Sequence, residues 1–284
     1  MKTLKTIKSI TTHSKIDGVV PGVKGQRAFP THSLRNTDPF IMLDHIGPQK
    51  LSKDYFMDGH AHPHRGFETI TFMFEGVMEH IDSLGNSATL KSGSVQRMNA
   101  GKGIIHGGDM SVADSQIFHE IQLWVNLPSS QKLSEPNIHN VHDHQIPVIE
   151  KGKVKIRIVS GKQQNIIGPI KTVHPINAFH IISNEDRILS ISDLPSTHNT
   201  YLYLMKGQIS INDQILESYN TISFNKDGDQ IEFEVKEGSE LLILSGEPIN
   251  EPVAMGGPFV MNTNEEIEQA YADYRDGKFG KVTV

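Results

Sequence analysis

The sequence contains no cysteine, and this absence excludes several kinds of chemistry at once. Without thiols the chain can form no disulfide, no thiolate metal site and no cysteine nucleophile. Any metal ion must therefore be held by histidine, aspartate or glutamate side chains.

An excess of positive charge is also lacking. The chain has 27 Lys and Arg against 33 Asp and Glu, a formal net charge of −6, which disfavours a phosphate-binding surface and direct contact with nucleic acid. No apolar run reaches the roughly 20 residues of a membrane span, and residues 1–15 lack the apolar stretch of a secretory leader. We expect a monomeric, cytoplasmic protein with no membrane partner.

What the chain does have is a series of short apolar or alternating runs between turn residues. The clearest runs are 70–74, 94–98, 121–127, 154–159, 201–205 and 241–244. Turn pairs such as Gly85-Asn86 and Asp227-Gly228 separate them at the intervals typical of β-sandwiches and barrels. The pattern predicts an all-β fold.

A short internal repeat predicts two related β-barrels. Residues 70–76 alternate and end in Glu-Gly, residues 201–207 alternate and end in Lys-Gly, and a polar hairpin follows each. A length of 284 residues suits two domains. The stretch 129–150, rich in Ser, Asn, His and Pro, has the composition of a linker, so we place the domains at 1–133 and 134–284.

One helix is expected near the C-terminus, over residues 263–276. Thr263 and Glu266 have the spacing of a capping box, and Gly277 provides a stop. Apolar side chains at helical spacing then form a stripe that should pack on a barrel: Ile267, Ala270, Tyr271 and Tyr274.

Histidines supply the sharpest candidate site. Residues 60–64 read His-Ala-His-Pro-His, and alternate residues of an extended segment share a face, so these imidazoles could converge on one ion. His106 follows glycines at 101 and 103 that could turn the chain, which lets its strand return beside the first segment. It is the candidate third ligand.

The alternative is that these imidazoles are exposed, or buried and hydrogen-bonded to backbone carbonyls. His139, His142 and His144 have a similar spacing but lie in the expected linker, with no glycine-turned strand after them, and we interpret them as solvated. Inside a barrel an unpaired imidazole would cost about 1 to 3 kcal/mol, which favours a metal at the first cluster.

Several longer motifs resemble one known family. Residues 62–69 read His-Pro-His-Arg-Gly-Phe-Glu-Thr, residues 98–106 read Met-x-Ala-Gly-x-Gly-Ile-x-His, and residues 122–128 read Gln-Leu-Trp-Val-Asn-Leu-Pro. Near the C-terminus, residues 250–254, 257–263 and 273–280 continue the likeness. Together they resemble the pirin family of the cupin superfamily over nearly the whole chain.

The resemblance implies two tandem cupin domains, which are jelly-roll-like β-barrels, with one metal ion in the N-terminal barrel. In the family three His and one Glu bind this ion, and His62, His64 and His106 match the three histidines. The family's Glu lies two residues after the third His and precedes a Met. Here that position is Gly108, followed by Asp109 and Met110.

Two interpretations of the missing acid remain open. In the first, Gly108 takes its place and leaves a three-His site. In the second, one residue is inserted, the glycines form a bulge and Asp109 supplies the carboxylate. Strict alternation favours Gly108 on the face of His106, but the following Met favours Asp109, which we predict as metal ligand and catalytic group. Glu68 is the reserve candidate.

The C-terminal barrel shows no equivalent set, since the positions that correspond to His62 and His64 are Asp193 and Pro195. We predict that it holds no metal. Its other candidate ligands are interpreted as ordinary polar residues: His174, His180 and His198.

Imidazoles with one carboxylate suit Fe(II), the expected metal, with Zn, Mn, Ni and Cu as alternatives. The resemblance then implies a dioxygenase similar to quercetin 2,3-dioxygenase, acting on a flavonol-like substrate with O2. Phe67, Phe72 and Phe74 are candidates for lining the barrel mouth, although core packing is favoured for each. The alternative is a non-catalytic regulator whose metal state controls binding to a transcription factor or metabolic enzyme.

Overall fold

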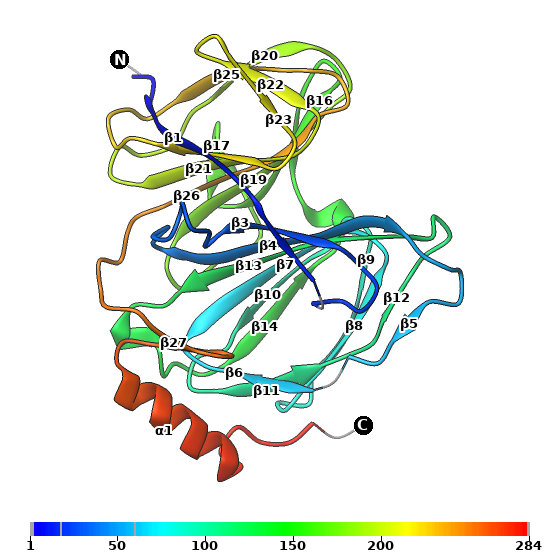
Figure 1. Ribbon diagram of the computed structural model, residues 1–284, viewed down its shortest axis with the longest axis vertical. Helices are drawn as coiled ribbons and strands as arrows, with labels where there is room; N and C mark the ends of the chain where they lie inside the picture. The colour runs from blue at the N-terminus through cyan, green and yellow to red at the C-terminus, as the bar shows by residue number, and fades with distance from the viewer. Residues whose placement is uncertain (1–2, 18, 60, 283–284) are drawn as a thin grey trace. The chain divides into compact units, whose positions relative to one another are not determined.

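The computed structural model describes residues 3–17, 19–59 and 61–282, and these form two compact units (Figure 1). We call the first the histidine unit; it comprises Lys15–Gly25, Phe40–Asp143 and Ile249–Val284. The second unit comprises Met1–Ser14, Gln26–Pro39 and His144–Pro248. His60, one of the histidines considered above, lies outside the described residues.

Both units are discontinuous, which differs from the expected division at residues 133 and 134. Strand β1 (Ile7–Thr12) pairs with β24 (Asn220–Phe224), so the start of the chain belongs with its C-terminal half. Near the other end, the Val260 amide donates to the Arg65 carbonyl, so the C-terminal segment belongs to the histidine unit. In the middle of the chain, the histidine unit ends at Asp143 and the second unit continues from His144.

Two sheets build the histidine unit. In one, antiparallel strands follow the order β14 (Asn137–Val141), β10 (Val95–Asn99), β7 (Phe67–Glu75), β13 (Ile117–Asn126) and β4 (Phe40–Lys50). The other has the order β5 (Phe56–Met57), β12 (Met110–Ser111), β8 (Val77–Asp82), β11 (Ile104–Gly107) and β6 (His62–His64), with β9 (Ser87–Lys91) paired to β8. Their apolar side chains share a core that includes Ile46, Met73, Leu90 and Phe118.

Helix α1 (Asn264–Arg275) belongs to the histidine unit and confirms the helix prediction. The Thr263 side chain accepts from the Glu266 amide, and the Glu266 side chain accepts from the Thr263 amide, so the capping box is complete. Ile267 and Ala270 are buried against the hairpin of β27 (Ala254–Gly256) and β28 (Phe259–Met261), beside which α1 lies in Figure 1. No helix in the described part of the chain is long and apolar enough to span a membrane.

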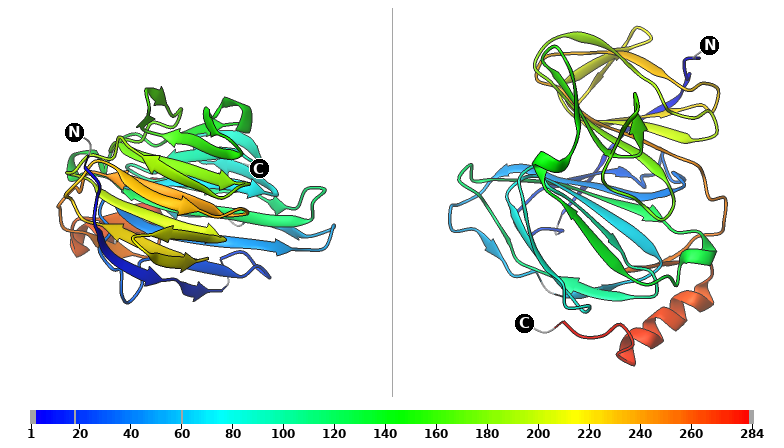
Figure 2. Two further views of the ribbon diagram at one scale, coloured as in Figure 1. Left: turned by 90° about the horizontal axis from the view of Figure 1, so that it is seen from above. Right: turned by 180° about the vertical axis from the view of Figure 1, so that it is seen from behind.

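The second unit repeats the two-sheet plan. Its larger sheet has the order β1, β24, β21 (Asn199–Lys206), β26 (Glu240–Gly246), β19 (Ile176–Ser183), β16 (Val154–Ser160) and β15 (Val148–Lys151), and Figure 2 shows these strands side by side. The smaller has the order β20 (Arg187–Ile191), β25 (Ile231–Val235), β22 (Gln208–Ile211) and β23 (Gln214–Glu217). The prediction of an all-β fold is confirmed. The predicted repeat is confirmed as well, since β21 lies between β24 and β26 as β7 lies between β10 and β13 in the histidine unit.

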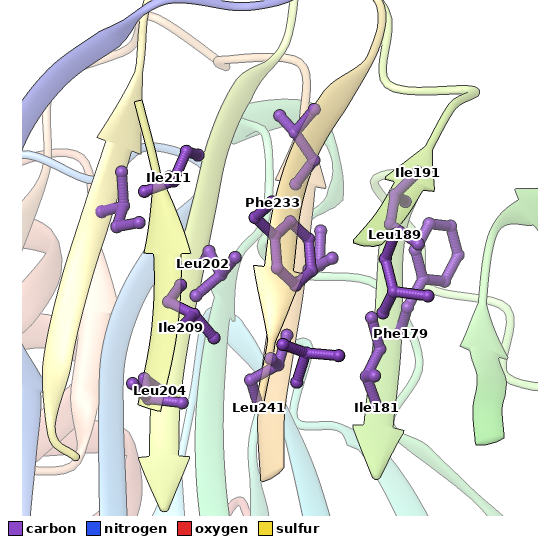
Figure 3. Packing of buried hydrophobic residues seen from close by; sticks show 14 of the residues in the cluster. Phe179, Ile181, Leu189, Ile191, Leu202, Leu204, Ile209, Ile211, Phe233 and Leu241 are labelled. Atoms are coloured by element: carbon purple, nitrogen blue, oxygen red, sulfur yellow. The ribbon is translucent and has the colours of Figure 1, made fainter. Parts of the chain in front are cut away.

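An apolar core joins the two sheets of the second unit. Figure 3 shows Phe179 and Leu202 from the larger sheet among Leu189, Ile209 and Phe233 from the smaller one. All of these side chains are buried, which gives this unit an apolar interior. The remaining short elements are β2 (Ser14–Ile16), β3 (Gly25–Phe29), β17 (Lys162–Gln163), β18 (Ile166–Ile167) and the 3-10 helices Ser129–Gln131 and Asp143–Gln145.

Candidate metal centre

Strand pairing brings three histidines together in the histidine unit. Strand β6 pairs antiparallel with β11, and the register places His62 directly opposite His106. His64, two residues along β6, shares their face because side chains alternate along a strand. The ring centroids lie 4.5 to 5.0 Å apart, and one nitrogen from each ring lies within 4.8 Å of the others.

Burial keeps two of these imidazoles, His64 and His106, neutral. His64 is buried, and burial, helped by the neighbouring His62, lowers its pKa to about 3. Its Nδ1 lies 3.2 Å from the Pro258 carbonyl oxygen, which can only accept, so Nδ1 carries the hydrogen and Nε2 keeps its lone pair. Burial likewise holds the pKa of His106 well below its usual range. Neutral imidazoles are the form that binds metals.

A buried ring nitrogen without a hydrogen-bond partner shows whether a metal ion fits this group. The Nε2 of His106 is buried and has no hydrogen-bond partner among the described residues. Such an atom is costly unless something binds it, and a cation shared with His62 and His64 would do so. Three imidazoles without a thiolate suit a divalent first-row ion, so the residues present fit a metal.

Asp109, the predicted fourth ligand, is not a member of this group of side chains. Along β8, the partners are Asp82 for His106, Ile81 for Gly107 and Met78 for Met110, so the register does not shift between β11 and β12. The bulge that would have turned Asp109 toward the histidines is therefore missing from this described stretch, and the structure leaves Asp109 out of the ligand group.

Gly108 takes the place on the face of His106, and the local packing requires glycine there. Its φ is +144°, a conformation that side chains disfavour. A Cβ at this position would lie 1.9 Å from the carbonyl oxygen of Glu79. No carboxylate can therefore be accommodated at residue 108 without moving β8, and the site has three histidines and no acid from this strand.

The other candidates from the sequence also have different roles. Glu68, the reserve acid, is buried and paired with Arg97, whose Nε lies 2.6 Å from Glu68 Oε1, and it is not a member of the ligand group. Phe67 packs against Trp124, with ring centroids 4.2 Å apart. Phe72 and Phe74 stack on each other, and none of the three phenylalanines lines the cavity described below.

Six further histidines that were considered from the sequence lie outside this group. His139, His142 and His144 are exposed. In the second unit, the ring nitrogens of the other three lie within hydrogen-bonding distance of protein atoms: His174 of the Glu247 carbonyl, His180 of Glu240 and His198 of Ser245.

Beside His62 and His106 opens a cavity of about 420 Å³. Its floor is a polar row that crosses three strands, because Gln122 pairs with Thr71 and Thr71 pairs with Gln96. These side chains are fixed by neighbours, since Trp124 donates to Gln122 and Gln96 donates to Asn140. The walls of the cavity include three apolar side chains, those of Met78, Met110 and Val20.

Sequence reasoning missed this floor and two further lining residues, His80 and Glu120. His80 lies on β8 with its ring stacked 5.5 Å from that of His106, and its Nε2 lies 3.2 Å from Asp82. The only signal was the polar residue at every second position of strands that are otherwise apolar, as in Thr69-Ile70-Thr71. That signal does not show which polar residues meet.

Comparison with known proteins agrees with these features. The family model for pirin matches residues 22–125, and the model for the pirin C-terminal cupin domain matches residues 182–280. A Pseudomonas aeruginosa protein provisionally assigned as a quercetin 2,3-dioxygenase is 35% identical over 94% of this chain and 95% of its own length. Human pirin is 33% identical over 97% of this chain and 94% of its own length.

A solved structure shows the same architecture. The crystal structure named as a quercetin 2,3-dioxygenase from Acinetobacter baumannii superposes with a TM-score of 0.89 at 30% identity, and covers 99% of this chain and 100% of its own. Both cupin domains and the motifs around His62 and His106 are thus accounted for by one family. The chain belongs to the pirin family, whose members are built from two cupin domains.

Proposed function

We propose that this protein is a metal-dependent dioxygenase that cleaves a flavonol-like substrate with O2. His62, His64 and His106 would hold one divalent ion, with Fe(II) the first candidate and Zn, Mn, Ni and Cu the alternatives. The observation that carries the proposal is the convergence of three imidazoles at the edge of a cavity with a polar floor. The similarity to the Acinetobacter baumannii protein supports the choice of substrate.

The cavity suits a small aromatic molecule that carries hydroxyl and carbonyl groups. Its volume of about 420 Å³ lies in the range of small-molecule sites. The amides of Gln96 and Gln122 and the hydroxyl of Thr71 can bind oxygen atoms of the substrate, while Met78 and Met110 can contact its ring faces. When bound, the ion would supply the redox and Lewis-acid chemistry for the reaction with O2.

Oxygen uptake by metal-loaded protein tests this proposal. Metal-free protein is loaded anaerobically with one ion at a time, and then oxygen uptake and carbon monoxide release are measured with flavonols and with unrelated enols. We expect uptake with flavonols in proportion to bound metal, and none in His106→Ala. Stoichiometric metal without any turnover would contradict the enzyme and would favour the regulatory alternative, which binds protein partners in a metal-dependent manner.

A further inference from the structure

Glu120 is a buried acid in the wall of the same cavity. It lies on β13 directly after an irregularity in the pairing with both neighbours, because the register shifts between Phe118 and Glu120 on the side of β4 and between His119 and Glu120 on the side of β7. Bulges of this kind re-aim a side chain and are common next to active sites. Here the chain places Glu120 among the residues that line the cavity.

The carboxyl group of Glu120 is poorly satisfied by the protein. Its direct strand partners are Ile46 and Met73, two members of the apolar core. The residue is 2% exposed, and its Oε2 is buried with no hydrogen-bond partner in the described part of the chain. An unpaired buried carboxyl oxygen costs free energy, and a ligand hydroxyl in the cavity could remove that cost.

Burial and one nearby acid raise the pKa of the Glu120 carboxyl group toward neutral pH. Burial is the main cause and the nearby Asp44 on β4 the second cause of a pKa raised to about 7. Strand β7 faces it with Met73 and Thr71, which carry no charge. The titratable groups that line the cavity are the exposed Asp58 and Glu79 and the histidines His62, His80 and His106.

We propose that Glu120 is the general base of this cavity and takes the proton from an acidic hydroxyl group of the bound substrate. The inference rests on the proposed function and adds a residue and a substrate requirement to it. The O–H bond of the substrate breaks, its electron pair stays on the substrate oxygen, and a new O–H bond forms at the Glu120 carboxylate. The proton remains in the cavity and no other reactant is needed.

This assignment also defines the class of ligand. A neutral enol or phenol with a pKa near neutrality can transfer its proton to a carboxylate of similar pKa. A ligand that is already an anion, such as a carboxylic acid at pH 7, has no proton to give to Glu120. We therefore expect Glu120 to assist the binding of flavonols but not that of simple aromatic carboxylates.

Ligand binding to zinc-loaded protein tests the assignment without turnover, because Zn²⁺ has no redox chemistry. Wild type, Glu120→Gln and a control, Glu75→Gln, are titrated with a flavonol at pH 7.5, and the absorption spectrum reports whether the bound ligand is neutral or anionic. A pH indicator counts the protons released. Glu75 lies on the neighbouring strand β7 and does not line the cavity.

In wild type and Glu75→Gln we expect the ligand to ionise without releasing a proton to solution. In Glu120→Gln it should either stay neutral or release about one proton per ligand bound. With Fe(II), kcat of Glu120→Gln should fall about 100-fold with a small change in KM. The change in kcat with pH near 7, which wild type should show, should be absent from this variant. Metal content and a urea unfolding curve establish that each variant is folded.

The outcomes separate the two proposals. Turnover by wild type together with the same spectrum, proton count and pH profile in Glu120→Gln overturns the role of Glu120 and leaves the dioxygenase intact. Wild-type protein that binds metal but neither binds nor consumes any flavonol overturns both the dioxygenase and the substrate assigned to Glu120.

Discussion

Replacing His106 with alanine is expected to lower the affinity for the metal ion by at least about 100-fold. Loss of a single hydrogen bond to a metal-binding histidine commonly weakens binding about 10- to 100-fold, so the loss of one of three direct ligands should cost more. The His106 Nε2 has no protein partner within the described residues, so binding an ion is the role left to it. The affinity is measured by competition with a chelator, with elemental analysis of the purified protein beside it.

His139→Ala provides the matched control, because His139 is an exposed imidazole outside the ligand group. It should keep the metal content of wild type. Added metal should also raise the melting temperature of wild type and of the control but not of His106→Ala, since an ion that binds only the folded state stabilises it by mass action. Equal metal content in His106→Ala and wild type would contradict the three-histidine site.

The metal-free protein should lose stability as the pH rises through 7, by about 3 kcal/mol from Glu120 alone. The pKa of Glu120 is raised from 4.5 in the unfolded chain to about 7 in the folded protein. Between these values the folded state holds a proton that the unfolded state has released. The contribution is therefore complete below pH 4.5 and is lost as the pH rises through 7.

Glu120→Gln isolates this contribution, because an amide cannot ionise. The free energy of unfolding is measured by urea denaturation from pH 4 to pH 8.5 for wild type, Glu120→Gln and Glu75→Gln. Buried His64 and His106 give an opposite slope, as their lowered pKa values favour the unfolded state in acid, but this slope is common to all three proteins. If wild type minus Glu120→Gln showed no dependence on pH, Glu120 would not be a buried acid of raised pKa.

Local sequence information was enough to predict α1 and the three histidines. The capping box at Thr263 and Glu266 involves residues three apart, and its hydrogen bonds form within one helical turn. The alternation of His62 and His64 fixes their common face, and the glycines before His106 return the chain beside them. These features depend on contacts within short segments or a single strand pair.

Features that depend on distant strands could not be predicted in the same way. The place of β1 follows from pairing with β24, more than 200 residues along the chain. The orientation of Gly108 and Asp109 depends on the register with β8, and a single inserted residue would have exchanged their faces. The placement of Glu120 depends on a bulge against both β4 and β7.

The acid of the site illustrates the difference. The sequence motif predicted Asp109, a carboxylate close to His106 in the chain. The structure instead provides a buried acid on β13, a strand that begins eleven residues after His106, and this acid reaches the same cavity from the opposite sheet. An acid can thus be close to the histidines in space without belonging to their sequence motif.

A crystal structure of the protein grown with Fe(II), with anomalous diffraction recorded at the iron edge, tests the metal centre most directly. We expect one anomalous peak bonded to the imidazoles of His62, His64 and His106, with Asp109 outside bonding distance and Glu120 facing the cavity. Imidazoles that point away from one another, or an ion bound by Asp109, would contradict the structure and the function proposed from it.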